Sequence, residues 1–139
     1  MILDQGRAEG VGWRLVLRPG NPACLELQPT RGTGGSIVCD EESEQDFNGD
    51  ERLRFIFGGV NEVQVPKFVF GFAVTEVARV RVDLASGESP GVATSSSPPL
   101  RGKRFFVVPL DPEPASEIEA VRGLNQAGAI GRKLRPRRP

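Results

Sequence analysis

Short runs in which apolar and polar residues alternate occupy most of the chain. In residues 11–18 (VGWRLVLR), Trp13 and Leu15 fall on one face, and Arg14 and Arg18 fall on the other. Alternation with a period of two residues is typical of a β-strand that is buried on one face. No segment keeps a 3.6-residue apolar period over three turns, and glycine- and proline-rich segments separate the runs. The pattern therefore predicts strands and turns rather than helices.

The number of these runs indicates the fold class. Strands are expected in residues 11–18, 23–28, 36–39, 53–60, 65–74, 76–88, 102–110, 117–124 and 129–134, with a short edge strand in 89–100. The run FVFGFAV is apolar on both faces, which is usual for a central strand that is covered on both sides. About eight to ten short strands separated by turns predict an all-β fold, a single antiparallel β-sandwich of the immunoglobulin-like or open-barrel kind.

The length of 139 residues is that of one domain. We place the β-sandwich domain at 10–134, an N-terminal extension at 1–9 and a basic tail at 135–139. The core should contain the residues that lie on the apolar faces of the strands. These are Trp13, Leu15, Leu25, Leu27, Phe70, Val80, Val82 and Phe106.

The charge balance and the absence of histidine exclude several functions. With 18 basic and 18 acidic residues the formal net charge is zero, so no nucleic-acid partner is expected. Without histidine, Ser-His-Asp and Cys-His catalysis is excluded. The lysines do not form a recognisable motif with serine, and Glu117 and Glu119 fit a solvated strand face better than an acid/base pair. We therefore expect no catalytic site, while an enzyme or ligand carrier that uses carboxylates or a bound metal stays open as the alternative.

An acidic segment, DEESEQDFNGDE at 40–51, holds the candidates for a metal site. Asp46, Asn48 and Asp50 have the spacing of the first ligands of a calcium loop. An EF-hand would next need glycine and later glutamate, where this chain has Glu51 and Phe57. A looser Ca²⁺ site remains a weak candidate, and a solvated acidic loop is the favoured interpretation. No other cofactor is expected.

The carboxyl end is basic. Five positive charges at a chain end are more often a solubilising tail or a linker than a binding element, although anionic lipid, a teichoic-type polymer or nucleic acid could bind there. The residues concerned are Arg132, Lys133, Arg135, Arg137 and Arg138.

Cys24 and Cys39 are the two cysteines of the chain. They cannot form a zinc site by themselves, and their spacing is not that of a redox C-x-x-C motif. A disulfide and two free thiols are the alternatives that the residues leave open. Cys24 falls on the polar face of its strand beside Glu26, whereas a buried free cysteine normally prefers the apolar face.

Several ordered motifs together resemble a group of uncharacterised extracytoplasmic β-sandwich domains of Gram-positive bacteria. The motifs are G-x-x-W-x-L, C-L-E-L, a second cysteine after a Gly-rich loop, V-A-x-V-x-V-x-L-x-x-G, F-F-V-V and A-x-x-x-x-G-x-x. In this chain they fall at Gly10 to Leu15, Cys24 to Leu27, Cys39, Val77 to Gly87, Phe105 to Val108 and Ala120 to Gly131. The resemblance implies the fold, a disulfide between the two cysteines and a location outside the cytoplasm. It implies no activity.

Taken together, these observations predict a non-enzymatic, extracytoplasmic module that binds a protein or ligand or takes part in cell-surface assembly. Its expected partner is a protein or a cell-surface polymer, and the sequence leaves open whether the chain forms a homo-oligomer. No apolar run approaches the roughly 20 residues of a membrane span. The start, MILDQGRAEG, lacks the pattern of a signal peptide, so we expect neither a leader nor an anchor within this chain.

Overall fold

The computed structural model describes residues 1–8, 10–41, 53–60, 67–100, 102–110 and 118–127, together with the backbone of 130–134. All regular structure in this part of the chain is β-strand. The strands are β1 (Ile2–Ala8), β2 (Val11–Arg18), β3 (Cys24–Pro29), β4 (Ser36–Cys39), β5 (Leu53–Gly59), β6 (Lys67–Val74), β7 (Arg79–Leu84), β8 (Gly91–Ala93), β9 (Lys103–Leu110), β10 (Ile118–Leu124) and β11 (Ile130–Leu134).

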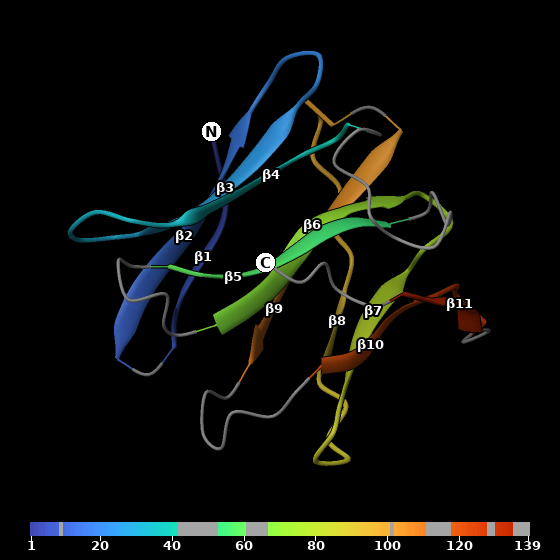
Figure 1. Ribbon diagram of the computed structural model, residues 1–139. Coiled ribbons are helices and arrows are strands. Elements are labelled where there is room, and N and C mark those ends of the chain that lie inside the picture. The colour runs from blue at the N-terminus through green and yellow to red at the C-terminus, as the bar shows by residue number, and fades with distance from the viewer. Residues whose placement is uncertain are drawn as a thin grey trace.

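The strands form three antiparallel sheets, which confirms the predicted all-β, sandwich-like fold. Sheet A has the order β1-β2-β3-β4, sheet B has the order β5-β6-β9, and sheet C has the order β11-β10-β7-β8. Sheet B lies between the other two, with sheet A on one side and sheet C on the other (Figure 1). The predicted hairpins β2–β3 and β10–β11 both form. The middle sheet makes three layers where a simple sandwich has two.

The strand β6 shows why a middle layer is stable. Its phenylalanines Phe68, Phe70 and Phe72 pack toward sheet A, while Val69 and Ala73 pack toward sheet C. A strand without a polar face must be covered on both sides, because exposing either side would leave large apolar surface in water. The two-sided apolar run therefore places β6 at the centre of the molecule.

The sequence prediction of the core is confirmed. All eight residues named above are buried, and the least buried of them, Trp13, has 5 % of its surface exposed. They divide between two clusters. Val80, Val82 and Phe106 lie in the cluster between sheets B and C, and the other five lie between sheets A and B.

The N-terminal segment differs from the expected extension. Residues 2–8 form β1, which pairs with β2 along its length. Most of β1 is exposed or half-buried, so its side chains show no clean alternation, and main-chain hydrogen bonds to β2 define it. Gly6 of β1 lies against the indole of Trp13, where a Cβ atom would collide with the ring. This close approach explains a glycine at that position.

Two short contacts join the sheets at their borders. Ser36 Oγ of β4 donates to Gly59 O of β5 over 2.8 Å, which connects sheet A to sheet B. An isolated bridge between Ser95 and Phe105 connects the segment after β8 to β9.

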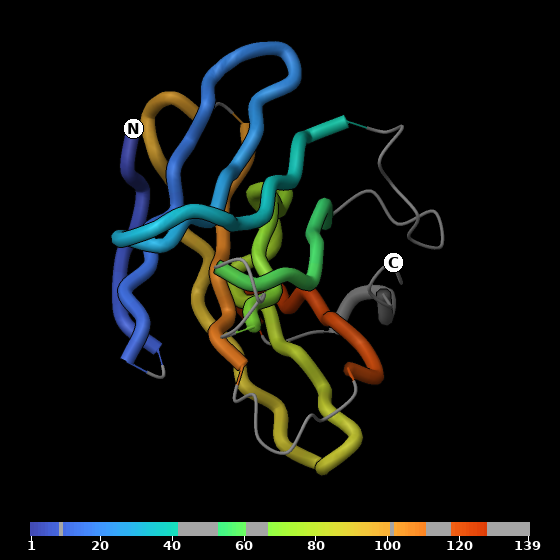
Figure 2. Tube along the Cα trace, turned by 60° about the vertical axis from the view of Figure 1, so that its left-hand side comes forward, coloured from blue at the N-terminus to red at the C-terminus, as the bar shows by residue number. Residues whose placement is uncertain are grey.

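The β2–β3 turn and the β7–β8 turn lie at opposite ends of the molecule (Figure 2). In the described ranges, no helix is long and apolar enough to cross a membrane.

Candidate functional site

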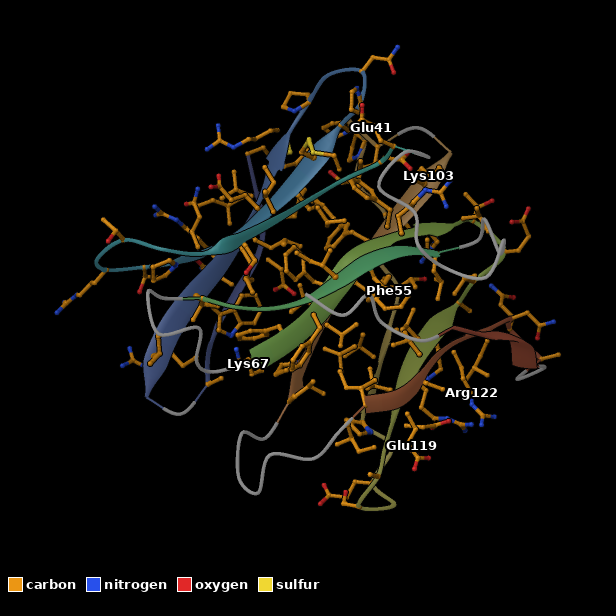
Figure 3. The ribbon with its side chains drawn as sticks, viewed as in Figure 1. Glu41, Phe55, Lys67, Lys103, Glu119 and Arg122 are labelled. Carbon is orange, nitrogen blue, oxygen red and sulfur yellow. A yellow bond between two sulfur atoms is a disulfide. The ribbon has the colours of Figure 1, made fainter. Side chains whose placement is uncertain are left out.

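Charged side chains gather on the outer faces of the two covering sheets. In β7, alternation buries the valines and leaves Arg81 and Asp83 half-buried on the outer face of sheet C. β10 continues this face with Arg122, which the strand register places opposite Arg81. Arg122 lies on the sheet C side of the molecule, whereas Phe55 lies in the interior (Figure 3). We call Arg79, Arg81, Asp83, Ser89 and Arg122 the sheet C cluster.

One carboxylate holds this cluster together. Arg81 Nε donates to Asp83 Oδ1 over 3.1 Å, and Ser89 Oγ donates to the same oxygen over 3.0 Å. Arg122 Nε lies 2.5 Å from Asp83 Oδ2, in an ion pair whose angle is not that of an aligned hydrogen bond. Asp83 therefore ties β7 to β10 and to the turn that follows β7.

The sheet C cluster has more positive than negative charge. Arg81 and Arg122 are directly opposite each other on neighbouring strands, and like charges in this position destabilise a sheet. Asp83 compensates only one of the two, and its side chain is 15 % exposed. Arg79, two residues before Arg81, is exposed on the same face. The sheet C cluster thus carries three guanidinium groups and one carboxylate, and Glu119, also on β10, is exposed.

The outer face of sheet A carries a second arginine–carboxylate network with a different balance. Arg18 donates from Nε and Nη2 to Glu26 Oε1, and Arg14 Nε donates to Gln28 Oε1 over 2.9 Å. Gln28 Nε2 donates to Glu26 Oε1 over 2.8 Å and so joins the two pairs. Burial raises the pKa of Glu26, but hydrogen bonds from Arg18 and Gln28 and the charge of Arg18 outweigh it, so the pKa is lowered. Each arginine here has its own acceptor.

The predicted disulfide between Cys24 and Cys39 is confirmed. The two residues are directly opposite in the β3–β4 ladder, and their Cα atoms are 4.0 Å apart. Both are half-buried, in agreement with the polar-face position of Cys24 that the alternation predicts. The bond covalently closes the loop between β3 and β4, at the edge of sheet A that borders sheet B.

Other sequence candidates are not tested by this geometry. The weak calcium candidates Asp46, Asn48 and Asp50 lie outside the described residues, as does the basic tail from 135 onward. In the described ranges, no group of three or more aspartates, glutamates or cysteines is placed to hold a metal ion. The carboxylates of Asp83 and Glu26 are both engaged by arginine.

Sequence reasoning did not identify the sheet C cluster as a unit. Alternation in VRVDL does predict that Arg81 and Asp83 face outward together. The position of Arg122 depends on the register between β7 and β10, which are separated by a long segment. Nothing in the local pattern fixes that register. Arg54 was also missed: it is 5 % exposed on β5, where its Nη1 donates to Leu53 O over 3.4 Å.

The chain is thus an all-β, disulfide-bonded domain with two polar outer faces. Comparison with protein-family models, with curated proteins and with solved structures found no match to this chain. Its function must therefore be inferred from these two faces and from their chemistry.

Proposed function

We propose that this chain is a non-enzymatic binding module that acts outside the cytoplasm, in contact with a protein or polymer of the cell surface. The observation that carries the proposal is the sheet C cluster, in which three arginines outnumber one carboxylate on the outer face of the sheet. Arginine is enriched at binding interfaces and among the residues that contribute most of the binding energy.

The disulfide supports the location. Disulfides persist in oxidising compartments and are rare in the cytosol, where thiols are kept reduced. The Cys24–Cys39 bond lies in a β-ladder and is half-buried. This position is suited to a permanent structural crosslink, which is what an extracytoplasmic domain of this kind needs.

Surface labelling of intact cells tests this proposal. Cells of the native producer are treated with an amine reagent that does not cross membranes, followed by recovery of the chain and of a cytosolic control protein. Lys67 and Lys103 are half-buried on β6 and β9 and offer amines for labelling. We expect the chain to be labelled, to remain with the cell envelope after washing and to contain no free thiol. An unlabelled chain with two free thiols would refute the proposed location, and a labelled chain that washes off would refute surface binding.

A further inference from the structure

The sheet C cluster carries three guanidinium groups and one carboxylate, and the exposed carboxylates Glu88 and Glu119 lie near one end of the same sheet. We propose that the outer face of sheet C binds a linear polymer whose charged groups are phosphates. In this proposal Asp83 holds Arg81 and Arg122 in the arrangement that receives the phosphates. The inference rests on the proposed function and names the class of ligand for that face.

The first step of the argument is charge. The three arginines supply three positive charges. Asp83 supplies one negative charge to this face. Because Arg81 and Arg122 are opposite each other, an added anion relieves a repulsion that Asp83 relieves only in part.

The second step is the set of free donors. Arg81 and Arg122 both use Nε toward Asp83, and each guanidinium has four further N–H groups on its two Nη atoms. Their side chains are 34 % and 17 % exposed, so these donors are partly shielded from water. A charge-assisted hydrogen bond is stronger in such a place than at a fully solvated site.

The third step is shape. Arg79 and Arg81 are two residues apart on one face of β7, which separates them by about 7 Å along the strand. On the neighbouring β8, Ala93 and Gly91 are opposite these two arginines. Neither residue has a side chain larger than a methyl group, so β8 does not cover the arginine row. The open row suits an extended ligand with repeated charges better than a single small anion.

Neighbouring acidic residues give the site a direction. Glu88 in the β7–β8 turn and Glu119 on β10 are both exposed, and both are near the end of sheet C that contains Leu84. Arg79 is at the other end of β7. Repulsion by the two carboxylates therefore favours a ligand path that runs from Arg122 and Arg81 toward Arg79.

Carboxylates and phosphates can both bridge two guanidiniums, as Asp83 does here, so the choice of phosphate rests on the donors that Asp83 leaves over. The two oxygens of a carboxylate lie in one plane, and Asp83 already occupies the position where such a group meets both Nε atoms. Phosphate oxygens are arranged tetrahedrally, so one phosphate can accept from two guanidiniums that come from neighbouring strands. The remaining Nη donors of Arg81 and Arg122 are suited to that bridging.

Binding of the full chain to inorganic polyphosphate, measured by calorimetry, tests the inference. The double variant Arg81→Gln/Arg122→Gln should bind at least about tenfold more weakly, the loss expected for charged hydrogen bonds. The matched control Arg14→Gln/Arg18→Gln removes the same charge from sheet A and should bind within about twofold of the parent chain. Affinity should fall steeply as salt rises, because phosphate contacts release counterions.

The variant Asp83→Asn tests whether Asp83 positions the two arginines for binding or whether the face binds through its positive charge alone. It makes the chain more positive, so charge alone would tighten binding. If Asp83 positions the arginines, the same variant binds polyphosphate more weakly. Arg79→Gln, at an exposed position, provides a variant with little risk to folding and should weaken binding several-fold with an unchanged melting temperature.

Several results would overturn the inference. These are equal losses in the sheet A and sheet C double variants, tighter binding by Asp83→Asn, polyglutamate bound as tightly as polyphosphate, and no polyphosphate binding by the folded parent chain. Surface retention is a separate readout. If the parent chain and the sheet C variants stay on cells equally well, the proposed function holds, and the outer face of sheet C is not its binding site.

Discussion

Sheets A and C perform the same structural task with different outer faces. Each covers one side of sheet B with an apolar inner face, and each carries arginines on its outer face. In sheet A, Arg14 and Arg18 have separate acceptors, and Gln28 joins the pairs into a network. In sheet C, Arg81 and Arg122 share Asp83. Similar alternation thus produces one face on which each arginine has its own acceptor and one on which two arginines share a single carboxylate. The register between neighbouring strands determines this difference.

The largest difference between an inner and an outer position should appear in sheet A. Leu27→Ala should destabilise the chain by about 2–5 kcal/mol, because Leu27 is fully buried and the truncation leaves a cavity. Ile37→Ala is the control on the outer face of the same sheet, where 48 % of the residue is exposed, and should cost less than about 0.5 kcal/mol. Denaturant unfolding measures both, and similar costs would mean that the two faces of sheet A are assigned wrongly.

Reduction of the disulfide should destabilise sheet A more than sheet C. Opening the Cys24–Cys39 loop should cost about 3 kcal/mol, the entropy of a loop of this length. Hydrogen exchange of the reduced chain should show lost protection first in β3 and β4, with β7 and β10 less affected, because the bond lies within sheet A. Equal loss of protection in the two outer sheets would show that they open as one unit.

A matched cavity in the other cluster tests whether sheet C is packed as tightly as sheet A. Val82 is fully buried between sheets B and C, and Val82→Ala should cost about 1–3 kcal/mol through lost burial and a cavity. Val92 on the edge strand β8 is only partly buried, so Val92→Ala should cost clearly less. An unchanged denaturation midpoint for Val82→Ala would contradict the inward register of β7.

The smallest expected effect is electrostatic and belongs to sheet A. The pKa of Glu26 is lowered in the folded chain, so its contribution is present above its unfolded pKa and is lost as the pH falls through the folded pKa. Glu26→Gln should therefore destabilise the chain near neutral pH by less than about 1 kcal/mol, with the difference vanishing in acid. Unfolding of both chains across a pH series measures this. A difference that grows toward acid would contradict the pKa direction.

Alternation predicted the strands and the core well, and it predicted neither the third layer nor the candidate site. Two-sided apolar runs such as β6 contain the information that both faces are covered, but they do not state by which strands. The outward positions of Arg81 and Asp83 follow from a period of two. The meeting of Asp83 with Arg122 depends on pairing between distant strands, which is decided by packing of the whole inner face. β1 escaped prediction because an edge strand with few buried side chains has little periodicity to detect.

The middle position of sheet B has a consequence for synthesis of the chain. The strands of sheet A are complete at Cys39, but the surface that covers them includes Phe105 and Val107 of β9. At about 5–20 residues per second, a ribosome needs roughly 3–13 seconds to make the intervening residues. During this time the indole of Trp13 and the leucines of β2 and β3 have no completed partner layer. We therefore expect the nascent amino-terminal half to expose this apolar surface. The yield of folded chain should then depend on chaperone supply and translation speed more than the stability of the finished domain would indicate.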